Sequence, residues 1–192
     1  VVQRVIVRYV METIRKDLLL LSRYGAAAFE MIGLEKKIFV EMYGVRFFGV
    51  VDRIDSIVPG TVRMVDYKTG NDSPSVIAVT DDMAEGAVAK IFDAEYGVRK
   101  ENKAALQFHI YDMLVQMMPE AEGKEIHNCI YSTANIFKDI PVTRPMNKKF
   151  YDAVSTHLEG LLATMYDTSV PFRRSGDEKT CGFCDFRNIC GR

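Results

Sequence analysis

The chain has 192 residues, of which 48% are apolar and 27% are charged, and its formal net charge is −1 at pH 7. This composition excludes a wholly disordered chain, and the length suits one domain with a sizeable core. The sequence has no apolar run near the roughly 20 residues of a bilayer span, no clean signal-peptide pattern, and no overall excess of positive charge. A nucleic-acid partner would therefore have to be held by a local basic patch or through metal ions.

The first third of the chain begins with a helical pattern and then changes to the period of a strand. Apolar residues recur at helical spacing over residues 8–32, and Gly33 is the expected end of that helix. Three strands follow, joined by turns at Tyr43-Gly44 and Pro59-Gly60, and they form an antiparallel meander. The strands are predicted at residues 37–42, 45–55 and 62–68.

The remainder alternates between helices and one further strand. We expect a polar loop, a weak helix, an amphipathic helix closed by Pro119, a strand and a last helix. These elements are predicted at residues 69–74, 81–97, 103–118, 126–137 and 147–166. The fold class is therefore α/β, with a central mixed sheet flanked by helices. We divide the chain into a core, residues 1–170, and a cysteine-rich tail, residues 171–192.

The third predicted strand carries a carboxylate and a lysine on one face. Side chains two apart in a strand share a face, so Asp66 and Lys68 point the same way. A carboxylate can bind a hard cation such as Mg²⁺, and a nearby lysine can stabilise negative charge on a phosphate. This pair is suited to metal-assisted phosphodiester hydrolysis.

A second carboxylate is expected beside Asp66, and strand pairing separates the two candidates. With the turn centred on Pro59, Asp52 lies opposite Asp66, whereas Asp55 lies opposite Arg63. Like charges that face each other are destabilising unless a cation lies between them. We therefore predict Asp52 and Asp66 as the metal pair and Asp55 as a structural residue. A register slip of one residue would reverse this assignment.

Three of the four cysteines lie within the last twelve residues, at Cys181, Cys184 and Cys190. A Cys-x-x-Cys pair with a third thiol nearby favours a metal or a cluster over a disulfide in an intracellular protein. Zinc and a [4Fe–4S] cluster both require four ligands, so one is lacking. Cys129 is the remaining thiol, but it lies in an apolar strand, where a buried and inert cysteine is the usual state.

Together these motifs resemble the PD-(D/E)xK nuclease superfamily, with its restriction-endonuclease-like core. The segment from Gly49 to Asp55, followed by Asp66-Tyr67-Lys68, is most similar to the RecB/AddB-type nuclease domains and the related Cas4-like exonucleases. Gln107 and Tyr111 match the Gln-x-x-x-Tyr motif of that group and share a face of the predicted helix. The tail cysteines resemble those that help to hold a [4Fe–4S] cluster in AddB and Cas4 relatives. The resemblance covers roughly residues 35–192.

The resemblance implies a role for each matched residue. Asp52 and Asp66 are the expected ligands of Mg²⁺ or Mn²⁺, with Glu35 a weaker candidate, and Lys68 is the expected catalytic lysine. Gln107 and Tyr111 are expected to contact the active site or the DNA. Cys181, Cys184 and Cys190 are the expected ligands of a cluster that holds the tail on the core.

Two features of the family pattern are missing. Relatives usually carry a metal-binding histidine on their first helix, but all three histidines of this chain lie downstream of the hairpin. A fourth cluster cysteine is also expected upstream, and the chain has no cysteine before Cys129. The chain begins with Val1, so we interpret it as part of a longer protein whose first helix and fourth ligand precede it. This is a reason to expect that the piece alone is inactive.

The sequence thus predicts a cytoplasmic, metal-dependent deoxyribonuclease, an exonuclease of RecB/AddB type that acts in double-strand-break repair and recombination. Its expected partners are DNA and a helicase portion or partner subunit, with no membrane. One alternative is a stand-alone Cas4-like exonuclease. The other is a catalytically silent DNA-binding or scaffold module, and the missing histidine is the reason to consider it.

Overall fold

The structure is a computed structural model that describes residues 2–70, 79–92, 100–171 and 178–191. Its elements follow one another as helix, three strands, two helices, a short 3₁₀ turn, two strands and two helices. They are α1 (Val2–Tyr24), β1 (Glu30–Met42), β2 (Val45–Ser56), β3 (Thr61–Lys68), α2 (Ala84–Phe92), α3 (Lys100–Gln116), η2 (Pro119–Ala121), β4 (Glu125–Ser132), β5 (Thr143–Pro145), α4 (Lys148–Tyr166) and α5 (Glu178–Gly182).

The five strands form one mixed sheet in the order β1-β2-β3-β4-β5. The first three strands form the predicted antiparallel meander, whereas β3 pairs in parallel with β4 and β4 pairs antiparallel with β5. A parallel pair needs a crossover connection, and the segment that carries α2 and α3 supplies it. The predicted α/β class with a central mixed sheet is confirmed.

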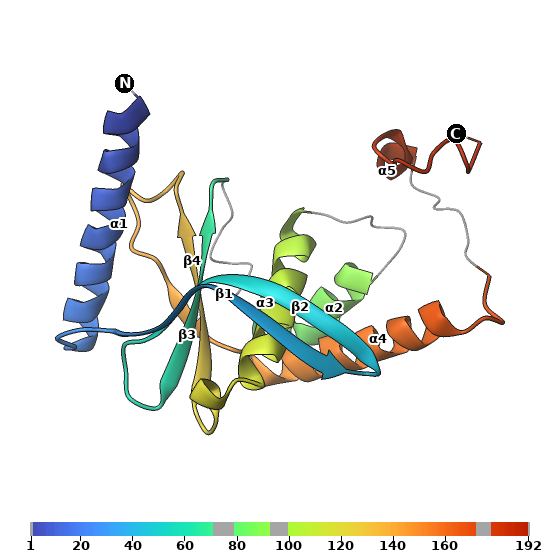
Figure 1. Cartoon of the computed structure of the whole chain (residues 1–192), viewed down its shortest axis with the longest axis horizontal. Coiled ribbons are helices and arrows are strands. Elements are labelled where there is room, and N and C mark those ends of the chain that lie inside the picture. Colours follow the sequence, from blue (N-terminus) through green and yellow to red (C-terminus); the bar gives the residue numbers. More distant parts are fainter. Residues whose placement is uncertain (1, 71–78, 93–99, 172–177, 192) are drawn as a thin grey trace.

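Helices cover both faces of the sheet, with α1 on one side and α2, α3 and α4 on the other (Figure 1). Each face has its own apolar core. Met64 of β3 packs into the core that contains Phe108 and Leu114 of α3, whereas Val65 packs into the core that contains Leu20 of α1. Successive residues of β3 therefore point to opposite layers, as the period of a strand requires.

Both predicted turns are present, and their backbone angles explain the residues at each. Tyr43 and Gly44 have φ angles of 54° and 69°, the positive values that a two-residue hairpin turn of type I′ requires. Gly60 has a φ of 80°, which a glycine adopts at no steric cost. The two turns set the pairing of β1, β2 and β3.

The predicted helix over residues 8–32 is wrong at its end. Helix α1 stops at Tyr24, because Gly25 has a φ of 64° and closes a Schellman motif. In this motif Gly25 N donates to Ser22 O at 3.2 Å, and Ala26 N donates to Leu21 O at 2.9 Å. Strand β1 therefore begins at Glu30, well before the predicted start at residue 37.

The remaining predicted elements have close counterparts in the described residues. Helix α2 lies within the predicted weak helix, and α3 and α4 match the two predicted long helices. Asn147 caps α4, since its side-chain oxygen accepts a hydrogen bond from Phe150 N at 2.7 Å. The predicted strand over residues 126–137 is too long, because β4 ends at Ser132 and turns follow it. Most of the predicted loop at residues 69–74 lies outside the described residues.

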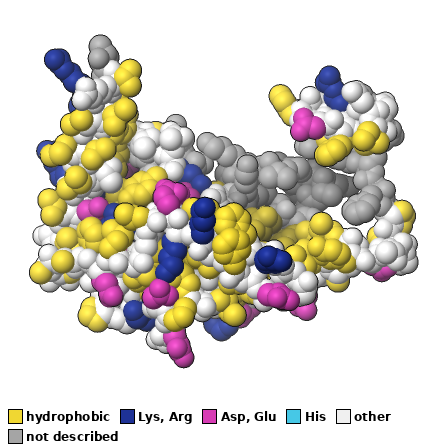
Figure 2. Space-filling model, viewed as in Figure 1, with side chains coloured by type: hydrophobic (Ala, Val, Ile, Leu, Met, Phe, Trp, Pro, Cys, Tyr) yellow, Lys and Arg dark blue, Asp and Glu magenta, His cyan; other side chains and the backbone are white. Residues whose placement is uncertain are grey.

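Helix α1 has a largely apolar exposed surface (Figure 2). Val2, Ile6, Met11 and Leu18 are each more than half exposed, with values of 72%, 57%, 60% and 61%. Within the part of the chain that the structure describes, no helix is long and apolar enough to cross a membrane.

Candidate functional site at the end of β3

The side chains of Asp66 and Lys68 lie close together at the end of β3. Lys68 Nζ is 2.8 Å from Asp66 Oδ2, and the Asp66 residue is only 4% exposed. The two residues share the strand face of Met64, which packs toward α3. A buried carboxylate beside a partly exposed ammonium group is thus directed at the helical layer, as the strand period predicts.

Gln107 of α3 connects the two charged side chains. Its carbonyl Oε1 accepts a hydrogen bond from Lys68 Nζ at 2.7 Å, and its Nε2 donates to Asp66 Oδ1 at 3.3 Å. The same Nε2 is 2.9 Å from the hydroxyl of Tyr111, one helical turn further along α3. The structure therefore brings together Asp66, Lys68, Gln107 and Tyr111, four of the residues that the sequence predicted for the site.

Asp52 of β2 reaches this group through the backbone of β3. The pairing of β2 with β3 has the predicted register, because Arg53 lies opposite Val65 and Asp55 lies opposite Arg63. One step further this register would place Asp52 opposite Asp66. Asp52 Oδ2 accepts a hydrogen bond from the backbone N–H of Tyr67 at 2.8 Å. The half-buried Asp52 carboxylate therefore contacts the backbone of the residue that separates Asp66 from Lys68 in the sequence.

Glu35, the weaker candidate ligand, has an unusual backbone conformation. Its φ of 45° is uncommon for a residue other than glycine. In the register of β1 with β2, Leu34 pairs with Arg53 and Lys36 pairs with Val51, so Glu35 lies across from Asp52. Glu35 is exposed. Among the residues that the structure describes, no group of three or more His, Cys, Asp or Glu side chains is arranged to hold a metal ion.

The donor set at the end of β3 is therefore two carboxylates, those of Asp52 and Asp66, beside an amide. Carboxylate oxygens are hard ligands, and Mg²⁺ typically binds through one or two of them while it keeps several waters. The chemistry of these donors fits a divalent cation of this class. Lys68 and Gln107 already contact Asp66, so the orientation of this carboxylate does not depend on the cation.

A buried ionic network lies on the opposite face of β2 and β3. Asp55 accepts hydrogen bonds from Arg63 at 2.8 Å and from Arg53 Nε at 2.6 Å, as expected for a structural rather than a metal-binding residue. Arg53 NH1 also donates to Asp17 of α1 at 2.8 Å, and the hydroxyl of Tyr131 donates to Asp17 at 2.6 Å. Asp17 and Tyr131 were not expected from the sequence. The signal available in the sequence was Asp17 itself, a charged residue on the side of α1 that faces the sheet.

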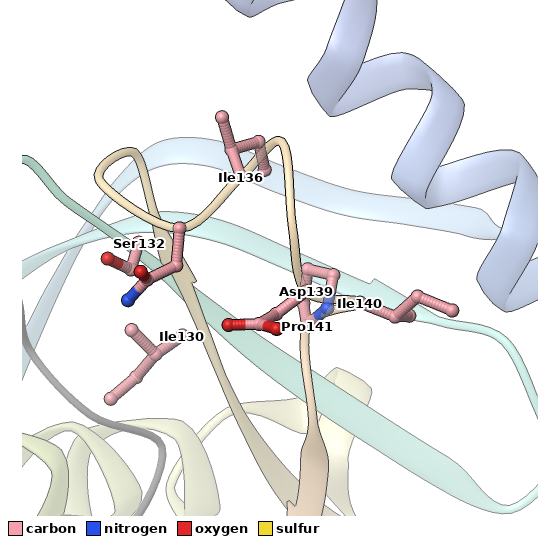
Figure 3. Close-up of a pocket in the computed structure, with 7 residues that line it drawn as sticks. Ile130, Ser132, Ile136, Asp139, Ile140 and Pro141 are labelled. Atoms are coloured by element: carbon pink, nitrogen blue, oxygen red, sulfur yellow. The ribbon is translucent and has the colours of Figure 1, made fainter.

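A small pocket of about 30 Å³ lies beside the end of β4. Figure 3 shows the Asp139 carboxylate pointing into it, toward the side lined by Ile130 and Ser132. Ser132 pairs with Lys68 across the parallel strands, and its hydroxyl donates to the carbonyl of Gly70 at 2.9 Å. The end of β4 thus contacts the backbone directly after Lys68.

The four cysteines are all free thiols. Cys129 is buried, and burial raises the pKa of its thiol to about 11, in keeping with the inert cysteine that the sequence suggested. Cys181, Cys184 and Cys190 lie in the tail segment that α5 begins, which Figure 1 draws apart from the sheet and its helices. Among the described residues these three thiols are not gathered into a metal-binding group.

The comparisons with known proteins agree with this geometry. The family model described as "PD-(D/E)XK nuclease superfamily" matches residues 3–191, nearly the whole chain. A search of curated proteins finds no match. Strand β3 ends in Asp66-Tyr67-Lys68, which has the (D/E)XK sequence of that name, and the mixed sheet flanked by helices is consistent with the fold of the family. The chain belongs to the PD-(D/E)XK nuclease superfamily.

Proposed function

We propose that the chain hydrolyses phosphodiester bonds of DNA with the help of a divalent cation. One observation supports this most strongly: the contact of Lys68 with both Asp66 and Gln107, at 2.8 Å and 2.7 Å. An aspartate and a lysine on one strand face are common on solvated sheets. A network that connects a buried aspartate with a lysine and a glutamine is much less common, because burying and ordering these side chains costs free energy.

In this proposal the carboxylates of Asp52 and Asp66 hold the cation, Mg²⁺ or Mn²⁺. When bound, the cation would neutralise charge on the phosphate and lower the pKa of a nearby water. Lys68 stabilises the negative charge that develops on the phosphate. Gln107 orients both of these side chains, because its carbonyl accepts from Lys68 while its N–H group donates to Asp66.

The partners of the Gln107 amide determine which way it points. The Tyr111 hydroxyl lies 2.9 Å from the Gln107 Nε2 that also donates to Asp66. A flipped amide would place its N–H group against the Lys68 ammonium, where two donors would meet. We infer that Lys68, which only donates, and the Asp66 carboxylate, which only accepts, together select a single amide orientation.

The narrower proposal is a RecB/AddB-type exonuclease of double-strand-break repair, acting in the cytoplasm as the C-terminal part of a helicase-nuclease. Gln107 and Tyr111 support it, because they match that group's Gln-x-x-x-Tyr motif. Gln107 contacts both Asp66 and Lys68, and Tyr111 contacts Gln107. A stand-alone Cas4-like exonuclease would use the same residues. The length of chain encoded before Val1 separates the two: several hundred residues favour the fused form, and a few dozen with a Cys and a His favour the other.

The test is degradation of linear DNA in the presence of Mn²⁺ by the full-length protein that contains this chain. Lys68→Ala should lower the rate by about 100-fold or more, as is typical for loss of a group that stabilises transition-state charge. Lys37→Ala is the matched control, because Lys37 is an exposed lysine on β1, and it should leave the rate unchanged.

Two results would contradict the proposal. One is a full-length protein that binds linear DNA but cuts none of it with Mn²⁺ or Mg²⁺, which would favour the silent DNA-binding module. The other is a Lys68→Ala protein that cuts as fast as the Lys37→Ala control.

We also propose that Cys181, Cys184 and Cys190 of the tail, residues 171–192, contribute to a [4Fe–4S] site in the longer protein. Only their Cys-x-x-Cys spacing and third thiol support this, and a fourth thiolate from elsewhere would be needed. Anaerobically purified full-length protein should then show a broad brown absorbance that Cys184→Ser removes. A colourless full-length protein with no bound iron would contradict the proposal.

A further inference from the structure

Strand β1 forms one edge of the sheet, and within the described residues it pairs only with β2. Its first part is irregular, because the register shifts between Met31 and Gly33 and because Glu35 has a φ of 45°. From Lys36 to Met42 the pairing with β2 is regular. An edge strand presents a row of backbone N–H and C=O groups that can pair with another strand. The regular half of β1 is therefore a template for one more strand.

The two-residue turn between β1 and β2 determines which backbone groups face this edge. Met42 and Val45 close the turn, and the residues that close such a turn form a hydrogen-bonded pair. Hydrogen-bonded and non-hydrogen-bonded pairs then alternate along the antiparallel ladder. Lys37, Phe39 and Glu41 therefore occupy non-hydrogen-bonded positions. Their N–H and C=O groups point away from β2, toward the edge.

The side chains of these three residues lie on the face of the hairpin that is turned away from α3. Ile38 and Val40 alternate with them and pack into the core on the α3 side. Phe39 is 62% exposed, and Lys37 and Glu41 are exposed on either side of it. The edge thus presents, in order along the strand, a cation, an aromatic ring and an anion.

A second copy of this strand can pair here antiparallel, and charge favours one register. Residues whose backbone groups point outward pair only with each other, so Phe39 can lie opposite Lys37, Phe39 or Glu41 of the second copy. The first choice sets Glu35 against Glu41, and the last sets Lys37 against Tyr43. With Phe39 opposite itself, Lys37 of each copy lies opposite Glu41 of the other. Opposite charges and paired aromatic rings stabilise such a pairing, whereas like charges destabilise it.

The space beside this edge is open on the α3 side. A groove of about 390 Å³ runs along residues 36–40, and its far wall includes Met117 and Pro119. Met117 is 60% exposed, so its side chain is available for contact. In the register with Phe39 opposite itself, Val40 of the second copy lies opposite Ile38 and points to the side of this groove. The groove therefore offers apolar surface to the inner face of the added strand.

We propose that the edge of β1 is a homodimer interface, in which residues 36–42 of two copies pair antiparallel about a twofold axis at Phe39. The interface is isologous, since each contact of Lys37 with Glu41 occurs twice. Charged residues on an edge usually prevent pairing between copies. Here they select one register in which opposite charges meet.

The dimer is expected to be weak and to leave the candidate active site uncovered. One pair of short strands buries little surface, which is typical of transient interfaces. The end of β3 lies two strands away from this edge in the sheet. The inference is therefore independent of the proposed DNA cleavage.

Sedimentation of the chain over a range of concentrations tests the proposal. A reducing agent excludes disulfides between the free cysteines of two copies. The parent chain should shift from monomer to dimer by about 500 μM, a concentration at which a weak interface assembles. Lys37→Glu should weaken the dimer about tenfold or more, because two pairs of carboxylates would then face each other. Adding Glu41→Lys should restore the dimer, and Lys138→Glu, at an exposed lysine after β4, should leave it unchanged.

Backbone hydrogen exchange tests the register itself. As the concentration rises, the N–H groups of Lys37, Phe39 and Glu41 should gain protection, whereas those of Ile38 and Val40, which already face β2, should change little. Circular dichroism establishes that each variant folds, and DNA cleavage enters neither measurement.

Three results would overturn the proposal. One is a parent chain that stays monomeric at about 500 μM, which would leave this edge to a strand of a different protein. Another is a dimer that Lys37→Glu does not weaken, as expected if the exposed apolar surface of α1 mediates association. The third is a dimer that Lys37→Glu weakens and that the added Glu41→Lys fails to restore.

Discussion

Asp66 and Asp112 are both buried carboxylates, but their surroundings differ. Asp66 has the Lys68 ammonium 2.8 Å away and an N–H group of Gln107 at 3.3 Å. In the described part of the chain, Asp112 has a single hydrogen bond, from the Asn128 amide at 3.2 Å, and no cation beside it. A buried charge is tolerated when it is paired and is otherwise neutralised. Burial with no cation beside it raises the pKa of Asp112 to about 8.

The raised pKa of Asp112 predicts how the stability of the protein changes with pH. The folded pKa of about 8 lies above the value near 4 of the unfolded chain, so between these values the native state binds more protons. Stability should then fall as pH rises, by up to about 2 kcal/mol between pH 6.5 and 8. The lowered pKa of His109 acts in the opposite sense but only below about pH 6.5, where it removes stability as pH falls.

Urea denaturation at pH 6.5 and pH 8 measures this change. The Asp112→Asn chain cannot ionise at this position, so its free energy of unfolding should change less over the same interval. A parent chain that is equally stable at both values, or one whose loss of stability persists in Asp112→Asn, would contradict the assignment.

At the scale of elements, β2 and α3 approach each other at Gly49. A Cβ at this position would lie 2.5 Å from Leu114 Cδ1 and 3.4 Å from Tyr111 Cε1. Gly49 opens the segment that carries Asp52, and Tyr111 contacts Gln107. The close approach of strand and helix at this glycine thus helps to set the distance between the two halves of the site.

Gly49→Ala should therefore destabilise the protein by about 1–3 kcal/mol, because the buried Leu114 side chain must move to admit the methyl group. Gly86→Ala is the matched control, since the added Cβ meets nothing within 4 Å on helix α2 and alanine is the better helix former. It should leave stability unchanged or raise it by up to about 1 kcal/mol. Thermal denaturation of both variants measures the difference. A Gly49→Ala protein as stable as Gly86→Ala would show that the helix and strand can separate without cost.

These elements differ in how much of their structure can be predicted from the sequence. The faces of β3 and its register with β2 could be predicted, because a strand alternates with period two and a Pro-Gly turn centres the hairpin. The spacing of Gln107 and Tyr111 predicted a shared helix face. The sequence could not predict that Gln107 contacts both Asp66 and Lys68. The long connection before α3 does not determine where that helix lies against the sheet. The end of α1 was missed because apolar periodicity outweighed the signal of Gly25.

Over the whole molecule, the two faces of the sheet carry different polar chemistry. The face toward α3 has the partly exposed Asp66–Lys68 network, whereas the face toward α1 has the enclosed Asp17–Arg53–Asp55–Arg63 network. The enclosed network contains two carboxylates and two guanidinium groups, so its charges balance. Asp17 was not expected from sequence, because its partner Arg53 lies on a strand that only the folded molecule brings to α1.

The parallel pairing of β3 with β4 has a kinetic consequence. The antiparallel meander of β1, β2 and β3 closes through short turns, so these strands can associate early. The last residues of β3 acquire their partner in β4 only after the intervening segment with α2 and α3 has been ordered, and closing so long a loop carries an entropic cost. We therefore expect Asp66 and Lys68 to reach their final environment late in folding. The same strand end should be among the first to open when the native protein fluctuates.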